Sequence, residues 1–166
     1  MQEDDLVSLL AAHLRAKEYN VLAAGANQSA AFRFSVADRR KAPDLVAERK
    51  GILIVAEGKI RSKSLFLKGP RGFSDYECME LLDACETARR SITAEASSRL
   101  ATIGHLCCAE SLRILPTVFA ADHFHAVASN FVGGPVLGLA VTERDPLPAE
   151  IDMVYTPAHW ANASIL

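Results

Sequence analysis

The spacing of apolar and polar residues along the chain predicts alternating helices and strands. Leucines within residues 4–19 recur at helical intervals behind an acidic start, which suits the positive end of a helix dipole. Residues 31–37 alternate phenylalanine and valine with polar side chains, which is typical of a strand with one buried face. The chain is therefore predicted to open with one amphipathic helix and one strand.

The rest of the pattern predicts a second long helix and further strands. Ser74, followed three residues later by Glu77, forms a capping-box pattern, which predicts a helix from Ser74 to about Leu100. The order of elements along the chain is one helix, three strands, a second helix and further strands. This order predicts an α/β fold with a mixed central sheet flanked by helices, in a single domain of residues 1–166. The strands are predicted at residues 31–37, 43–48, 52–60, 114–121, 123–128, 136–142 and 151–155.

The two strands at 43–48 and 52–60 carry charges within an otherwise apolar stretch. Lys50-Gly51 is a plausible two-residue turn, because glycine supplies the positive φ that such turns need. With that turn, the numbers of any two opposing residues add up to 101. Asp44 then lies opposite Glu57, and Lys59 lies on the same face because side chains alternate along a strand.

Two facing carboxylates resist ionisation unless a cation lies between them. A hard divalent ion such as Mg²⁺ or Mn²⁺ suits such an oxygen-rich site, and a nearby lysine can position a water molecule and offset negative charge. Together these groups predict phosphodiester hydrolysis. The alternative is structural: Glu57 and Lys59 form an exposed pair on an edge strand, and Asp44 is an ordinary acid after Pro43.

Charge is distributed unevenly along the chain. The net charge is −2, but residues 33–71 contain eleven lysines and arginines against four acidic residues. A basic stretch beside the hairpin could contact phosphates independently of nucleotide sequence, although a solvated surface loop explains it equally well. The candidate nucleic-acid contacts are Arg39, Arg40, Lys41, Arg61 and Lys63.

Other features favour a cytoplasmic protein that does not enter a membrane. The acidic N-terminus lacks the basic start of a signal peptide, and no apolar run is long enough for a membrane-spanning helix. The four cysteines form no CxxC pair and are expected to be reduced. His123 and His125, with Cys107-Cys108 upstream, could be imagined as a zinc site, but their spacing matches no known zinc pattern, so core or surface roles are favoured.

Pro43-Asp44, twelve intervening residues, and then Glu57-Gly58-Lys59 resemble the motif of the PD-(D/E)XK nuclease superfamily. The helix and strand before this motif and the helix after it are similar to the αβββαβ core of the restriction-endonuclease-like fold. Within that group the chain looks most like Holliday-junction-resolvase-like endonuclease domains. The resemblance implies a nuclease core over about residues 3–128 and a C-terminal extension over residues 129–166.

The resemblance also implies roles for individual residues. Asp44, Glu57 and the backbone carbonyl of Gly58 would bind Mg²⁺, for which Mn²⁺ could substitute, and Lys59 would assist the attacking water. Many members add a carboxylate from the first helix. Asp5 is the first candidate for that ligand, with Glu3 and Asp4 as alternatives.

These roles predict a metal-dependent endonuclease that hydrolyses phosphodiester bonds, with DNA as the expected substrate and a 5′-phosphate left on the product. Because many such enzymes dimerise to cut two strands, a homodimer is an expected assembly. Two alternatives stay open. One is a catalytically inactive module of the same fold that binds nucleic acid or assembles with proteins. The other is an unrelated α/β enzyme acting on a small molecule, in which the three charges would lie apart.

Overall fold

The computed structural model describes residues 1–144 and 149–166 of the chain. The strands of its main sheet are β1 (Asn20–Ala24), β4 (Leu45–Arg49), β5 (Ile52–Lys59), β6 (Arg113–Ala120), β7 (Leu137–Thr142) and β8 (Glu150–Tyr155). They lie in the order β1-β4-β5-β6-β7-β8. β5, β6 and β7 run parallel, whereas the other neighbouring pairs are antiparallel. The fold is therefore α/β with a mixed central sheet, as predicted.

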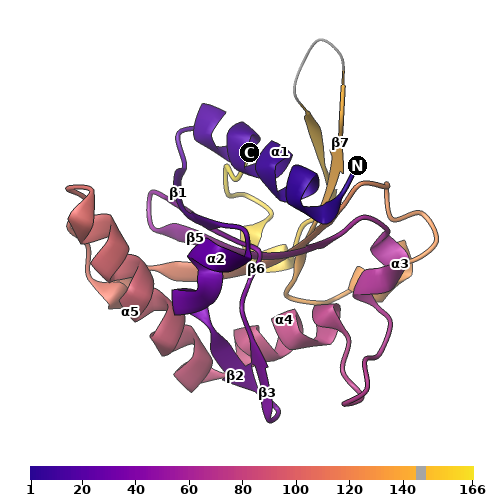
Figure 1. Cartoon of the computed structure of the whole chain (residues 1–166), viewed down its shortest axis with the longest axis horizontal. Coiled ribbons are helices and arrows are strands. Elements are labelled where there is room, and N and C mark those ends of the chain that lie inside the picture. Colours follow the sequence, from indigo (N-terminus) through magenta and orange to yellow (C-terminus); the bar gives the residue numbers. More distant parts are fainter. Residues whose placement is uncertain (145–148) are drawn as a thin grey trace.

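Helices cover both faces of this sheet (Figure 1). The α-helices are α1 (Glu3–Ala16), α2 (Ala26–Ser29), α3 (Ser62–Leu65), α4 (Asp75–Ala84) and α5 (Glu86–Thr102). α1 packs against β1, β4, β5 and β7, whereas on the other face α4 packs against β5 and β6 and α5 packs against β1. Across the described residues, the helices are too short or too polar to cross a membrane. Short 3-10 helices occupy Ala30–Phe32, Ala109–Ser111, Ala128–Phe131 and Ala158–Trp160.

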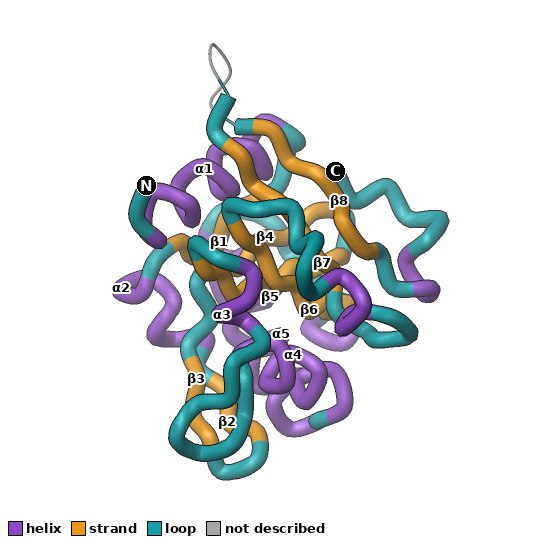
Figure 2. The backbone as a smooth tube through the Cα atoms, turned by 90° about the vertical axis from the view of Figure 1, so that its right-hand side faces the viewer, coloured by secondary structure: helices purple, strands orange, loops and turns teal. Residues whose placement is uncertain are grey.

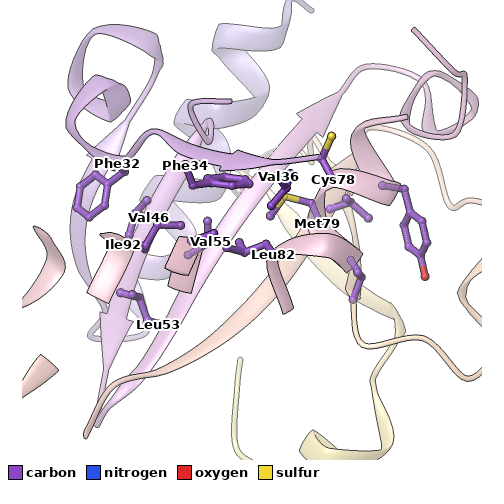
Figure 3. Packing of buried hydrophobic residues seen from close by; sticks show 14 of the residues in the cluster. Phe32, Phe34, Val36, Val46, Leu53, Val55, Cys78, Met79, Leu82 and Ile92 are labelled. Atoms are coloured by element: carbon purple, nitrogen blue, oxygen red, sulfur yellow. The ribbon is translucent and has the colours of Figure 1, made fainter. Parts of the chain in front are cut away.

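The sheet separates two apolar layers. Leu45 and Ile54 point toward α1, whereas their neighbours Val46 and Val55 point toward α4 and α5. Strand alternation therefore places Glu57, two residues after Val55, on the side of α4 and α5. Figure 3 shows the apolar layer on that side, where Val55 packs among residues from several elements.

Residues 31–37 were predicted to form the first strand of the central sheet, and this prediction was wrong. The first strand of the main sheet is β1, which was not predicted because Asn20–Ala24 is short and lacks a clear alternation. Phe34–Val36 forms β2 instead, which pairs only with β3 (Arg39–Lys41) in a separate two-stranded sheet. The alternation is nevertheless real, since Phe34 and Val36 are buried against α4 and α5 (Figure 3).

The predicted long helix is two helices that meet at Cys85. Ser74 caps α4 as expected, because its hydroxyl accepts a hydrogen bond from the N–H of Glu77. Cys85 has an extended backbone (φ −99°, ψ 103°), which ends α4 and lets α5 take a new direction. The break contains neither glycine nor proline, so tertiary packing decides it: α4 covers β5 and β6, whereas α5 covers β1 and β2.

The predicted strand at residues 123–128 is also absent from the structure. The carboxylate of Asp122 accepts the N–H of Phe124, and Phe124 adopts a positive φ of 62°. An aspartate that binds the backbone two residues later favours a turn over a strand. The strands predicted at 136–142 and 151–155 are confirmed as β7 and β8, so residues 129–166 complete the main sheet.

Gly58 in β5 is required by packing. A Cβ atom at this position would lie 2.4 Å from ring carbons of Phe119, which is fully buried on the neighbouring strand β6. Such a contact is much shorter than a van der Waals separation. Gly58 therefore lets β5 and β6 pair while Phe119 fills the layer under α1.

We expect Gly58→Ala to destabilise the protein by roughly 1–3 kcal/mol, the usual cost of forcing extra volume into a packed core. Chemical denaturation monitored by circular dichroism measures this change. Gly69→Ala is the matched control, because a Cβ atom there would meet nothing closer than 3.6 Å. Equal stability of the two variants would contradict the packing role.

Candidate active site

The hairpin that carries the three charges has the register predicted from the sequence. Lys50 and Gly51 form the turn, with φ values of 51° and 83°. The paired residues from Arg49 with Ile52 to Leu45 with Ala56 all add up to 101. Asp44 lies one residue beyond this ladder, and its N–H donates to the carbonyl of Ala56 at 2.9 Å. β4 and β5 therefore bring Asp44 next to the end of β5.

Asp44 is fixed by a backbone hydrogen bond. Its carboxylate oxygen Oδ2 accepts the N–H of Gly58 at 2.9 Å. Burial raises the pKa of Asp44, while the Gly58 N–H and the charges of Lys41 and Lys59 oppose that rise.

Glu57 is the most deeply buried charged group of the site, with 5% of its surface exposed. Its Oε1 atom lies 3.1 Å from Nζ of Lys41. Its Oε2 atom is buried and has no hydrogen-bond partner among the described residues. Burial, followed by the negative charge of Asp44, raises the pKa of Glu57 from 4.5 to about 8, although Lys41 acts against the shift.

Lys41 links the small hairpin β2–β3 to α4. Its ammonium lies 2.7 Å from Oδ1 of Asp75, the first residue of α4, in addition to its contact with Glu57. Burial alone would lower the pKa of Lys41, but the neighbouring charges of Glu57 and Asp75 outweigh it and raise the pKa. Arg39 also reaches Asp75, at 3.4 Å, and donates to the carbonyl of Phe73.

The predicted phosphate-binding residues thus divide into two groups. Arg39 and Lys41 face inward and are held by Asp75. The side chains of Arg40, Arg61 and Lys63 are exposed. Lys41 is partly buried and contacts two acidic side chains, so it is not available to a phosphate. The exposed side chains of the second group are available.

Lys59 ends β5 and reaches toward the first helix. Its ammonium lies 3.3 Å from a carboxylate oxygen of Glu3 in α1. Burial alone would lower the pKa of Lys59, but Glu3 outweighs it, so the pKa is raised and the lysine stays charged. Asp5, the first candidate for the helix ligand, instead accepts the N–H of Gln2 at the start of α1. Of the two acids, it is therefore Glu3 that contacts Lys59.

The site therefore joins elements that lie far apart in the sequence. Asp44, Glu57 and Lys59 were predicted from the sequence, and the structure brings them together at one end of the β4–β5 hairpin. Asp75 and the inward role of Lys41 were not predicted. The capping box placed Asp75 in the first turn of α4, but nothing in the local sequence shows that this turn lies beside β3.

The residues present suit a hard divalent cation. Asp44 and Glu57 offer carboxylate oxygens, and the buried Oε2 of Glu57 has no hydrogen-bond partner in the described part of the chain. The carbonyl of Gly58 lies between Glu57 and Lys59 in the sequence. The described residues contain no group of three or more histidine, cysteine, aspartate or glutamate side chains placed to hold a metal ion. Any such site here would therefore use two side chains and a backbone oxygen.

Comparison with models of known protein families gave no match, and comparison with curated proteins gave none either. The structure defines an α/β protein with a mixed six-stranded sheet and a buried cluster of charges at one end of a central hairpin.

The raised pKa of Glu57 makes stability depend on pH. The folded protein holds the proton of the Glu57 carboxyl group more tightly than the unfolded chain does. The stabilisation from this bound proton is complete below about pH 4.5 and is lost as the pH rises to about 8. Replacing Glu57 with glutamine removes the ionisation. We therefore expect Glu57→Gln to gain stability over the wild type by about 2–4 kcal/mol between pH 5 and pH 8.

Urea denaturation of both proteins at several pH values tests this prediction. Glu48→Gln is the matched control, because Glu48 is a buried glutamate of β4 for which Asn20 provides a hydrogen bond. A stability difference between Glu57→Gln and the wild type that stays constant from pH 5 to pH 8 would show that Glu57 is not held protonated.

Proposed function

We propose that this protein is a metal-dependent nuclease that hydrolyses phosphodiester bonds of nucleic acid, with DNA as the substrate. The observation that carries the proposal is the buried Glu57, whose Oε2 is unpartnered among the described residues, beside Asp44 and Lys59. Ionising a buried carboxyl group costs free energy, and Lys41 offsets that cost only in part, so a divalent cation beside Glu57 and Asp44 would stabilise the ionised form.

The order and direction of the elements support the proposal. α1 is followed by the antiparallel strands β1, β4 and β5, then by α4 and α5, and then by β6, which runs parallel to β5. This order fits the αβββαβ core of the restriction-endonuclease-like fold that the motif resembles. The β2–β3 hairpin is an insertion between the first two strands of that core.

Asp44, Glu57 and the Gly58 carbonyl would hold Mg²⁺ or Mn²⁺. When bound, such an ion lowers the pKa of a coordinated water and offsets charge on a phosphoryl oxygen. The protein contributes rigid placement, since the N–H of Gly58 fixes the carboxylate of Asp44 and the sheet fixes Glu57. Glu57 must lose its proton to act as a ligand, so cation affinity increases with pH.

Lys59 provides a positive charge at the rim of the site. About 30% of its side chain is exposed, so a phosphate in solvent can approach it, and its ion pair with Glu3 holds it in place. A lysine in this position stabilises the negative charge that develops on the phosphate and orients the attacking water. The exposed cations Arg40, Arg61 and Lys63 lie on segments next to the site and would bind neighbouring phosphates.

We expect purified wild-type protein to cleave plasmid or single-stranded DNA with Mg²⁺ or Mn²⁺, and EDTA to abolish cleavage. Glu57→Gln and Lys59→Ala should each lower the rate constant by roughly 10²–10⁴-fold, because each removes a group that acts in the transition state. Gel assays with end-labelled DNA measure these rates and identify the 5′-phosphate on the product.

Glu48→Gln and Lys50→Ala are matched controls on the same hairpin, a buried glutamate and an exposed turn lysine. Both should cleave at the wild-type rate. Equal activity of Glu57→Gln and the wild type would rule out the proposed site, even if the preparation degrades DNA.

One observation favours the alternative of an inactive module that binds nucleic acid or proteins. The ammonium of Lys41 already lies 3.1 Å from Glu57 and 2.7 Å from Asp75, so a cation within the chain neutralises part of the cluster. In an inactive module this network would serve stability, and the hairpin would need no metal. The two functions therefore differ in whether Asp44 and Glu57 bind a divalent cation.

Isothermal titration with Mn²⁺ separates these two functions. A nuclease site should bind Mn²⁺ more tightly at pH 8 than at pH 6, and Asp44→Asn should weaken binding at least tenfold because one charged ligand is lost. Asp38→Asn, an exposed acid in the turn of the β2–β3 hairpin, is the control. Binding that is absent, or unchanged in Asp44→Asn, supports the inactive module.

A further inference from the structure

A second charged feature lies beyond the end of β5. A cavity opens at the carboxyl ends of the parallel strands β5 and β6, between α3 and the loop that follows β6. Figure 2 shows α3 in front of the sheet near these strand ends. Its lining comprises Ile60, Arg61, Ser62, Lys63, Ala121, Asp122, His123, His125 and Ala126.

Four of these side chains are basic. Arg61, which directly precedes α3, and Lys63 within α3 lie on one wall. His123 and His125 lie on the opposite loop, with ring centroids 5.7 Å apart. All four are exposed and therefore open to a ligand from solvent. The cavity thus concentrates groups that donate hydrogen bonds to anions.

The acidic groups near the cavity are largely occupied. Both oxygens of Asp122 accept backbone N–H groups at 2.8 Å, one from Ser62 and one from Phe124. Partial burial would raise the pKa of Asp122, but these hydrogen bonds outweigh it and lower the pKa, so the carboxylate is stabilised within the wall. A carboxylate oxygen of Asp152 in β8 lies 3.8 Å from Nδ1 of His123, which is beyond hydrogen-bond distance.

The two walls are joined to each other. Asp122 from the loop after β6 binds the N–H of Ser62 in α3, and the N–H of Ala121 donates to the carbonyl of Ile60 at 3.2 Å. The basic side chains therefore project from a preformed frame, which lowers the entropy lost when a ligand binds. Neither Cys107 nor Cys108 is among the lining residues, so the cavity lacks the thiolates of a histidine–cysteine zinc site.

The position of the cavity relates it to the proposed active site. Ile60 in its lining directly follows Lys59, which ends β5. In α/β proteins, ligands bind at the carboxyl ends of parallel strands, which is where this cavity opens. A strand whose scissile phosphate lies beside Lys59 would therefore place an adjacent phosphate near Arg61 and the two histidines.

We propose that this cavity binds a backbone phosphate of the nucleic-acid strand, one step along the chain from the phosphate that is cleaved. Arg61 and Lys63 supply the charge, and His123 and His125 supply further hydrogen-bond donors from the opposite wall. The identity of the ligand rests on the proposed nuclease function. The site itself extends that function, because it fixes the direction in which the strand leaves the active site.

Binding in the absence of divalent cations tests the cavity separately from cleavage. The probe is a fluorescein-labelled single-stranded oligonucleotide in EDTA, followed by anisotropy over a range of salt concentrations. We expect Arg61→Ala/Lys63→Ala to weaken binding roughly tenfold or more and to reduce the slope of log affinity against log salt by about one to two. His123→Ala/His125→Ala should weaken binding about threefold to tenfold.

Two matched double variants serve as controls. Arg15→Ala/Lys17→Ala removes two exposed cations at the end of α1, and His105→Ala/His159→Ala removes two exposed histidines outside the cavity. Both should bind the oligonucleotide as the wild type does. Thermal denaturation confirms that all variants are folded.

The outcomes distinguish the cavity from the active site. Cleavage that needs Glu57, with unchanged binding in both cavity variants, overturns the phosphate subsite and leaves the nuclease function intact. Binding that depends on the cavity, without any cleavage by the wild type, overturns the nuclease function and makes the cavity a phosphate site of the inactive module. A mononucleotide that competes as tightly as the oligonucleotide overturns the assignment to a strand backbone. No binding at all in EDTA overturns the phosphate subsite, whereas the nuclease function is judged by cleavage alone.

Discussion

The rest of the site depends on the burial of the Glu57 carboxylate at the end of an apolar hairpin. Ionising a carboxyl group in this position is costly, and its neighbours offset that cost only in part, since its pKa is still raised to about 8. Lys41 from the β2–β3 hairpin supplies the nearest positive charge, and Asp75 from α4 holds Lys41 in place. Three elements that are separate in the sequence therefore meet at one buried carboxyl group.

Much of the central hairpin could be predicted from the sequence, because its geometry is local. The Lys50-Gly51 turn sets the register, and the register sets the faces of Glu57 and Lys59. The first strand of the sheet could not be predicted in the same way. Asn20–Ala24 has little alternation of its own and becomes a strand because it pairs with β4, whereas the clearer pattern around Phe34 belongs to a separate hairpin.

The same distinction applies to the candidate site. Asp44, Glu57 and Lys59 were identified because all three lie on one hairpin or next to it. Lys41 was expected to face phosphates, since a basic stretch in a sequence does not reveal which of its side chains turn inward. Its contact with Asp75, and that of Lys59 with Glu3, follow from the packing of hairpin and helices around the sheet. Such contacts are a property of the fold as a whole.

The position of Lys41 has a consequence for how this architecture can diversify. The lysine that counterbalances Glu57 is delivered by a two-stranded ribbon that is not part of the six-stranded ladder. Changes in the length or sequence of that ribbon can therefore alter the proton affinity of Glu57 while every backbone hydrogen bond of the main sheet is kept. Burial and Asp44 tie the acidity of Glu57 to the main sheet, whereas the opposing contribution of Lys41 comes from a segment that can vary separately.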